Sequence, residues 1–208
     1  AVRLEGYDIQ AEMTVTMRAG FHKYTFSESK KANVIIDLIH GIEDKAIDSE
    51  IRIIDDKTIA GFRRSKGWAK NHIVYFYAEF SQPFRNFGIE KDGTLLGKKT
   101  QARGDKIKAF VQFESMANNS LLVKVGISHS SAEGAKKNLT TEIPGWDFAK
   151  IKQEAEDNWQ KELSAIVIKS SDENKKRVFY TALYHALLNP NVMSDVDGSY
   201  LGMDGKLH

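Results

Sequence analysis

The chain has 208 residues, of which 30 are basic and 28 acidic, so its formal net charge at pH 7 is +2. This length suits one large domain or one domain with the start of another, and 41% hydrophobic residues is typical of a globular protein rather than a disordered or fibrous one. The near-neutral charge disfavours nucleic acid as a partner, and the absence of cysteine excludes disulfides, thiolate metal sites and cysteine nucleophiles.

From Ile9 to about Ser130, apolar residues recur with period two, the signature of strands that bury one face. The first such stretch alternates at Ile9, Ala11, Met13, Val15 and Met17. Further short candidates, rich in β-branched and aromatic residues, are FHKYTFS, NVIIDLI, EIRII, TIAGF, IVYFYAEF, IKAFVQF and LLVKVGI. Turn signals separate these stretches and no helical pattern interrupts them, so we predict a mainly β fold, an antiparallel β-sandwich.

After about Ser131 the apolar period changes to three or four residues, which indicates amphipathic helices. One stripe consists of Phe148, Ile151, Ala155, Trp159 and Leu163. Asp147 is placed to cap this helix, and Ser171 or Asp172 to cap a second helix that ends before Pro190. The broad apolar face of the second helix comprises Val178, Phe179, Ala182, Leu183, Ala186 and Leu187. Two helices cannot bury such faces alone, so we expect them to pack on the sandwich or on helices beyond His208.

Neither a membrane span nor a signal peptide is visible in the sequence. No apolar run approaches the roughly 20 residues that a bilayer-spanning helix needs. The first ten residues, AVRLEGYDIQ, lack the basic flank and the apolar stretch of a secretory signal. Composition alone therefore leaves the compartment open.

The stretch GFRRSKGWAKNH sets Arg63, Arg64, Lys66 and Lys70 around Trp68. A basic stretch with an aromatic side chain can bind single-stranded nucleic acid, which the overall charge disfavours. The same groups suit a sugar site, where the tryptophan face packs against a pyranose and an arginine donates hydrogen bonds to hydroxyls. The plainer alternative is a solvated loop between two strands, in which Trp68 partly covers the core.

The stretch SDVDG places Asp195 and Asp197 two residues apart. On an extended chain both carboxylates would face one side, with Cα atoms roughly 6.5–7 Å apart. The spacing does not match an EF-hand calcium loop, and adjacent strand positions are too alike to separate the pKa values of an acid and a base. The alternative is a structural turn with positive φ at Gly198, Gly202 and Gly205. The six histidines are isolated, so we expect no metal site within this chain.

Six stretches, in order along the chain, carry a resemblance to a known family. They are AGFHKYTF, GFRRSKGWAKNHIVYFYAEFSQPF, LVKVGISHSSAEGAKKNL, EIPGWDF, WQKEL and FYTALYHALLNPNVMSDVDGSYLGMDGKLH. From about Gly20 to His208 the chain resembles glycoside hydrolase family 92, the bacterial calcium-dependent exo-α-mannosidases. The resemblance implies a β-sandwich domain over residues 1–130, a linker with a helix over 131–170, and the start of an (α/α)6 barrel, incomplete in this chain, over 171–208.

The implied activity is hydrolysis of terminal α-linked mannose with inversion, in which an acid protonates the leaving oxygen and a carboxylate base activates water. The resemblance also implies a calcium ion that binds sugar hydroxyls. It places the acid, the base and the calcium ligands beyond His208, so we expect this segment alone to be inactive. The implied partners are mannose-containing glycans and the remainder of the same polypeptide, in a periplasmic or secreted location.

The resemblance also points to residues that would support the sugar pocket. Asp195, Asp197 and Asp204 would lie in a barrel loop at the pocket mouth, and Arg64 and Trp68 would face it from the sandwich. All five are substrate-binding candidates. A rival interpretation is a non-catalytic carbohydrate-binding β-sandwich module, which the helical tail with its wide apolar face disfavours.

Overall fold

The computed structural model describes residues 1–26, 32–114 and 120–208. The strands are β1 (Val2–Leu4), β2 (Ile9–Val15), β3 (Ala19–Phe26), β4 (Ala32–Asp37), β5 (Lys45–Ile53), β6 (Thr58–Lys66), β7 (His72–Phe80), β8 (Asn86–Lys91), β9 (Thr94–Leu95), β10 (Gln101–Gly104), β11 (Ile107–Phe113) and β12 (Ser120–Ser128). A short 3-10 turn, η1 (Glu5–Tyr7), follows β1. The helices are α1 (Ala132–Glu142), α2 (Phe148–Leu163) and α3 (Glu173–Ala186).

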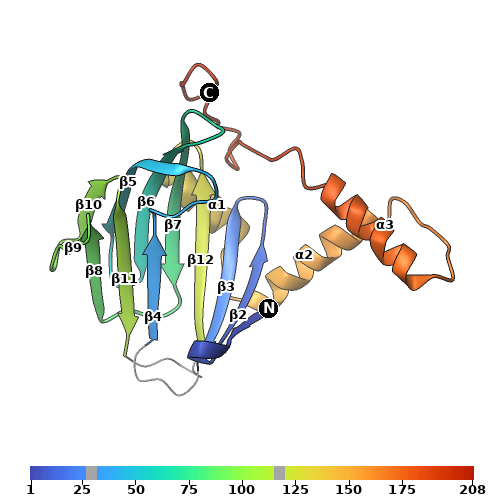
Figure 1. The fold of residues 1–208 in the computed structure, drawn as a ribbon, viewed down its shortest axis with the longest axis horizontal. Helices are drawn as coiled ribbons and strands as arrows, with labels where there is room; N and C mark the ends of the chain where they lie inside the picture. The colour runs from blue at the N-terminus through green and yellow to red at the C-terminus, as the bar shows by residue number, and fades with distance from the viewer. Residues whose placement is uncertain (27–31, 115–119) are drawn as a thin grey trace.

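The strands form two stacked sheets (Figure 1). One sheet has the order β1-β2-β3-β12-β7-β6-β5-β10 and the other the order β4-β11-β8-β9. All pairings between the described strands are antiparallel. The mainly β, antiparallel sandwich predicted from the period-two pattern is therefore confirmed.

The main core lies between the two sheets, where inward-facing side chains of both sheets meet. In β11, Ile107, Ala109, Val111 and Phe113 are all buried, as the alternation in IKAFVQF predicts. The sequence pattern did not predict β1, β8, β9 and β10, because each is short or carries few apolar residues.

The alternation in β2 was misinterpreted as a buried face. Ala11 is buried, but Met13 and Val15 are 60% and 59% exposed and Met17, just after the strand, is 73% exposed. In Figure 1 the smaller sheet lies over other strands of the larger sheet, away from β2, and Val15 and Met17 line a groove between the sandwich and the helices instead. Thr14, on the opposite face, is buried instead, beside its cross-strand partner Phe21.

Helix α1 lies on the outer face of the larger sheet, mainly against β12 and β7. Ser131 caps it by accepting a hydrogen bond from the backbone N–H of Gly134. The approach is close, because a Cβ on Gly126 of β12 would collide with the carbonyl oxygen of Ala135. The sequence pattern did not predict α1, because AEGAKKNLTTE has too few apolar residues to show a helical period.

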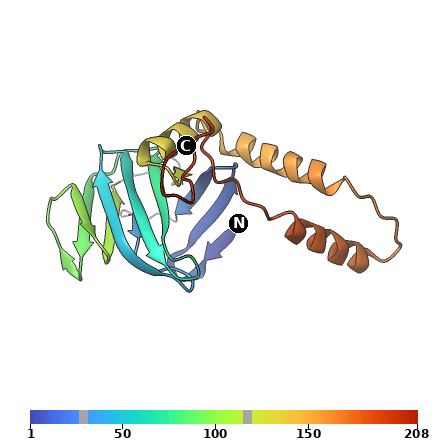
Figure 2. The same cartoon turned by 90° about the horizontal axis from the view of Figure 1, so that it is seen from above.

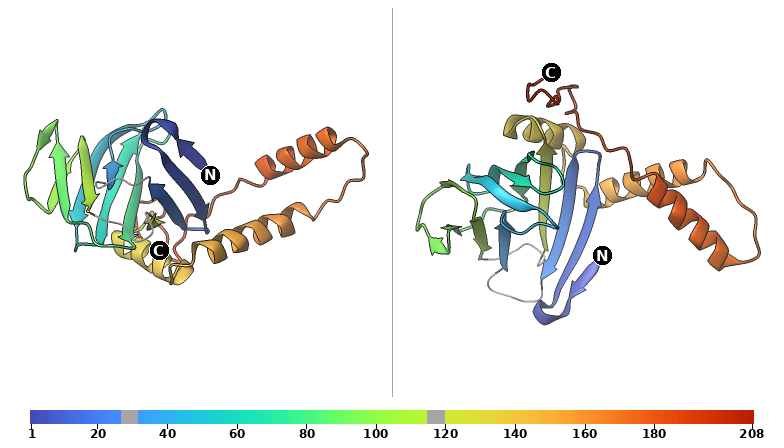
Figure 3. Two further views of the ribbon diagram at one scale, coloured as in Figure 1. Left: turned by 90° about the horizontal axis from the view of Figure 1, so that it is seen from below. Right: turned by 45° about the horizontal axis from the view of Figure 1, so that its top comes forward.

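Helices α2 and α3 project together from the sandwich as an arm, hereafter the helical arm (Figures 2 and 3), and Trp159 of α2 contacts Tyr184 of α3 with ring centroids 4.7 Å apart. Asp147 caps α2 and Asp172 caps α3, as predicted. The first turn of α2 packs Phe148 and Ile151 against Phe21 and α1. Beyond that turn the arm has little cover, and no residue of α3, all of which the structure describes, is buried. None of the described helices is long and apolar enough to cross a membrane.

Candidate functional site

The segments that carry the predicted site residues lie at one end of the sandwich (Figure 1). The β4–β5 loop and the β6–β7 turn reach this end from the sheets. The chain after α3 leaves the helical arm and returns to the same end, beside α1 (Figure 2). The structure thereby brings Arg64, Trp68 and the three aspartates to one end, although it does not bring them into one cavity.

Trp68 occupies the tip of the β6–β7 turn with its side chain fully exposed. It lines a shallow pocket of about 290 Å³ together with Ile42, Asp44 and His72. Arg64, on β6, donates from Nε to Oδ1 of Asn71 at 2.6 Å. The turn between β6 and β7 is a solvated loop, as the plainer alternative states, but Trp68 does not cover the core. An exposed indole beside a polar pocket has the shape and chemistry that stacking on a sugar ring needs.

Asp44, which lines this pocket, forms an ion pair with Arg63. Arg63 donates from both terminal nitrogens to Asp44, at 2.6 and 3.0 Å, and from Nε to the carbonyl oxygen of Leu38. The hydrogen bonds from Arg63, and then from Ser65, lower the pKa of Asp44 from 3.8 to about 2, so Asp44 is ionised at neutral pH. Burial lowers the pKa of His72, which favours its uncharged form there.

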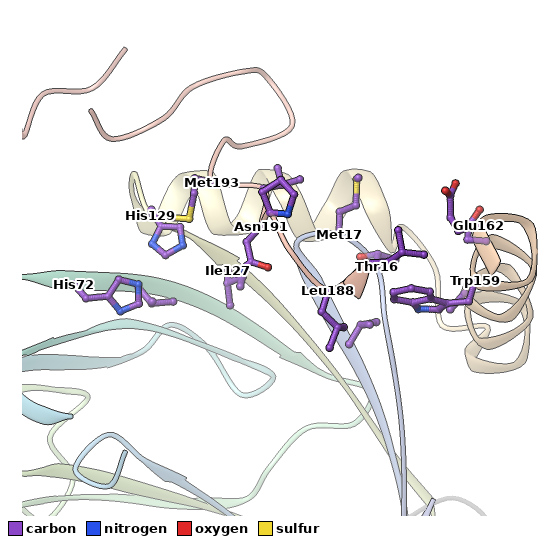
Figure 4. Close-up of a pocket in the computed structure, with 17 residues that line it drawn as sticks. Thr16, Met17, His72, Ile127, His129, Trp159, Glu162, Leu188, Asn191 and Met193 are labelled. Carbon is purple, nitrogen blue, oxygen red and sulfur yellow. The ribbon is translucent and has the colours of Figure 1, made fainter. Parts of the chain in front are cut away.

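A larger groove of about 810 Å³ separates the sandwich from the helical arm (Figure 4). Trp159 and Leu188 enter it from the helical side, and Met17 and Ile127 from the sandwich. The imidazoles of His72 and His129 lie at one end with ring centroids 5.3 Å apart. None of the five predicted site residues is among the described residues that line this groove.

The C-terminal segment is a series of turns rather than the extended chain that would align two carboxylates. The backbone N–H of Asp195 donates to the carbonyl oxygen of Ser199, and that of Gly198 to the carbonyl oxygen of Asp195. Gly198 and Gly205 have φ of 88° and 74°, which confirms the structural-turn alternative at these two positions.

Gly202 does not share this positive φ. A Cβ at Gly202 would lie 2.6 Å from Oδ1 of Asp204 and 2.7 Å from the ring of His208, so a larger residue there would displace these two side chains. The close approach of these side chains keeps the last turn compact.

The three aspartates have different surroundings. Asp195 is buried, with 4% of its surface exposed. Asp197 accepts from Nζ of Lys137 at 2.9 Å, and this hydrogen bond is the main cause of its lowered pKa. Asp204 accepts from the backbone N–H of Lys206 and contacts His208, and these bonds lower its pKa. Asp197 and Asp204 lie at the surface, where a ligand can reach their remaining lone pairs.

The described residues do not fit the calcium ion that the resemblance implies. They contain no group of three or more histidine, aspartate or glutamate side chains close enough to share a metal ion. Calcium takes six to eight oxygen ligands, so these side chains by themselves do not provide a carboxylate cluster for it.

Sequence reasoning missed several residues that shape this end of the molecule. They are Arg18, Ser128, His129, Lys137, Asn138 and Glu142. Each of them makes a hydrogen bond to a position 56 to 176 residues away, and no local pattern marks such pairs.

The chain matches one family along most of its length. Residues 1–128 match the glycosyl hydrolase family 92 N-terminal domain and residues 134–208 the catalytic domain of the same family. A protein of Arthroderma benhamiae, described as an uncharacterized secreted glycosidase, is 30% identical over 88% of this chain. This chain spans 27% of that relative.

Solved structures agree with the family match. A family GH92 alpha-mannosidase from Bacteroides thetaiotaomicron superimposes with a TM-score of 0.93 and 32% identity over 99% of this chain, and it is also known in complex with mannoimidazole. A GH92 inverting mannosidase from Bacteroides thetaiotaomicron VPI-5482 gives a TM-score of 0.86 and 26% identity over 97% of the chain. The chain spans 28% of each of these structures.

Proposed function

Because the chain belongs to glycosyl hydrolase family 92, we propose that it forms part of an exo-acting α-mannosidase, which removes terminal α-linked mannose from glycans with inversion. The main support is the superposition on a GH92 alpha-mannosidase, which covers the sandwich, the helices and the C-terminal turns together. The mannoimidazole complex of that enzyme and the inverting mannosidase among the similar structures support the substrate class and the stereochemistry.

In this proposal the chain supplies one wall of the sugar pocket. Trp68 packs against a pyranose ring, and Arg64 donates to hydroxyls. Asp197 and Asp204 accept hydrogen bonds from hydroxyl groups at the pocket mouth. The acid and the base of an inverting reaction stand roughly 6.5–9.5 Å apart with a water between them, and we assign both to residues outside this chain.

The other parts of the proposal concern organisation and location. We assign residues 1–130 to the sandwich domain, 131–170 to a linker and 171–208 to the beginning of a helical barrel. A calcium ion in the whole enzyme would take its ligands from outside the described residues. A periplasmic or secreted location is supported by the secreted relative from Arthroderma benhamiae.

Release of mannose from α-1,2-mannobiose tests the proposal. We expect a protein of full family length that contains this chain to release mannose, and to lose the activity on addition of a calcium chelator. We expect the 208-residue chain alone to release none. Mannose release by the chain alone, lost with the chelator, would contradict the assignment of the acid and base to other residues.

Isothermal titration of the 208-residue chain with mannose oligosaccharides distinguishes the rival carbohydrate-binding module. Micromolar binding by the chain, with no hydrolysis by the full-length protein, would favour the module. Hydrolysis by the full-length protein and no heat with the chain alone would favour the enzyme.

A further inference from the structure

Asp195 is a buried carboxylate in a segment whose other residues are mostly exposed. Its side chain points away from solvent, toward β12 and α1, and only 4% of the residue is exposed. A buried carboxylate is costly unless its oxygens receive hydrogen bonds. The partners of Asp195 therefore indicate what the residue does.

Both oxygens of the Asp195 carboxylate accept hydrogen bonds from side chains. Oδ2 accepts from Oγ of Ser128 at 2.9 Å, and Oδ1 accepts from Nδ2 of Asn138 at 2.7 Å. Ser128 Oγ also accepts from the backbone N–H groups of Ser130 and Ser131. Since its lone pairs face these donors, its single hydrogen is directed to Asp195.

Asn138 joins the C-terminal segment to the sandwich. It is fully buried in α1, and its Nδ2 donates a second hydrogen bond to the carbonyl oxygen of Ile127 in β12 at 2.8 Å. Its Oδ1 accepts from the backbone N–H of Val196 at 2.9 Å. One amide thus holds a strand, a helix and the segment after α3 in a fixed arrangement.

Gly134, in the first turn of α1, makes room for the carboxylate. A Cβ at this position would collide with Oδ2 of Asp195 and lie 2.7 Å from Oγ of Ser128. Glycine is less favourable than alanine inside a helix, so its presence here is explained by the space that Asp195 requires. The positive end of the α1 dipole also favours a carboxylate beside this turn.

A second contact anchors the same segment from the other side. Arg18, in the β2–β3 turn, donates from Nε to the carbonyl oxygen of Ser194 at 2.6 Å and pairs through its NH1 nitrogen with Glu142 of α1. By contrast, α3, which precedes the segment in the chain, has no buried residue. The sandwich and α1 thus set the position of the segment, although α3 is its neighbour in sequence.

We propose that Asp195 is a positioning residue, which fixes residues 196–208 on the sandwich and so determines where Asp197 and Asp204 meet a bound mannoside. Asp195, Ser128, Asn138 and Gly134 together form the Asp195 anchor. The anchor acts on substrate through the loop and does not touch the sugar. Its effect on substrate binding rests on the proposed function, whereas the docking of the loop does not.

Hydrogen exchange of the 208-residue chain tests the docking. In Asp195→Asn, the new NH2 group must face a donor, either Nδ2 of Asn138 or the crowded hydroxyl of Ser128. We expect amide exchange at Val196 and Gly198 to accelerate at least about tenfold, while exchange in β11 stays unchanged. Asp157→Asn, an exposed carboxylate on α2, is the matched control and should leave both regions unchanged.

Gly134→Ala tests the same contact from the helix. Alanine strengthens an isolated helix, so a local effect on α1 would slow exchange in this region. We expect faster exchange at Val196 instead. In the Asp195→Ala background, Gly134→Ala should accelerate this exchange less, because the carboxylate that the methyl group would displace is then absent. Gly6→Ala, where a Cβ would meet nothing within 4 Å, is the control. If Gly134→Ala does not fold, Ser128→Ala tests the same contact without adding volume, because it removes the hydroxyl that donates to Asp195, and it should also accelerate exchange at Val196.

Kinetics of a full-length family protein that contains this chain test the functional step. We expect Asp195→Asn to raise KM for an α-mannoside about tenfold and to change kcat less than about twofold, since the loop shapes binding and not the acid or base. The proposal would be overturned if Asp195→Asn left amide exchange at Val196 unchanged. It would also be overturned if exchange accelerated while KM stayed the same. If the wild-type protein hydrolyses no mannoside, the proposed function fails while the exchange result still decides the docking.

Discussion

The β-sandwich and the helical arm differ in what covers their apolar side chains. In the sandwich, two sheets and α1 enclose Phe21, Ile51, Val111 and Phe113, which are at most 1% exposed. In the arm, Val178 and Leu187 of the predicted apolar face are 70% and 42% exposed, and Trp159 packs mainly on Tyr184, with ring centroids 4.7 Å apart. Both regions have clear apolar periods, yet only the sandwich has a second layer that covers them.

This difference shows what an apolar period specifies. The period selects helix or strand and defines the face to be buried, because side-chain direction follows from backbone geometry. It does not specify what covers that face. The second layer comes from residues distant in sequence, and β2 shows the same effect on a smaller scale, since Met13 and Val15 continue the alternation of Ala11 but are exposed.

The largest expected effect comes from the sandwich core. Phe113→Ala should lower the free energy of unfolding by about 3–5 kcal/mol, because a fully buried phenylalanine leaves a cavity. Val178→Ala on α3 should change it by less than about 0.5 kcal/mol. Urea denaturation followed by circular dichroism measures both. Equal losses of stability in the two variants would show that the arm is as well packed as the sandwich, and the two regions would then not differ in how their apolar side chains are covered.

A smaller effect is expected at the joint between the sandwich and α1. Glu142 accepts from the backbone N–H and the guanidinium of Arg18, and the two side chains are 13% and 17% exposed. Glu142→Ala should cost about 2–3 kcal/mol, because it leaves these donors without their acceptor. The matched variant Glu154→Ala, in an exposed pair with Lys150 on α2, should cost less than about 0.5 kcal/mol. A similar loss in both variants would argue against a rigid joint.

The smallest effect concerns the ion pair of Asp44 with Arg63 at the sandwich end. Because the pKa of Asp44 is about 2 in the folded chain and 3.8 ordinarily, its contribution is present above pH 3.8 and disappears as the pH falls toward 2. Asp44→Asn should therefore cost about 1 kcal/mol at pH 7 and almost nothing near pH 2. Thermal melts across this range measure the difference. If the loss of stability in Asp44→Asn did not vary with pH, it would come from packing rather than from the charge of Asp44.

The sequence predicted candidate site residues, which remain a prediction, but not their geometry. The residues around Trp68 suggested a sugar-binding surface, and the structure leaves that indole exposed beside a polar pocket. The aspartates of the C-terminal stretch were recognised as a group, but their roles were not separable. Asp195 is buried because its carboxylate accepts hydrogen bonds from Ser128 and Asn138, which are 67 and 57 residues away in the sequence.

The sequence by itself determined the strand and helix periods, the cap at Asp147, the turn-forming character of the last segment and the family, because each depends on local geometry or on a run of residues. The tertiary structure alone decided that α1 forms, that Met13 and Val15 of β2 stay exposed, and that Asp195 turns inward while Asp197 stays at the surface. These outcomes depend on contacts between residues that are distant in sequence. A short stretch of neighbouring residues does not specify which of its side chains will be buried or hydrogen-bonded by such contacts.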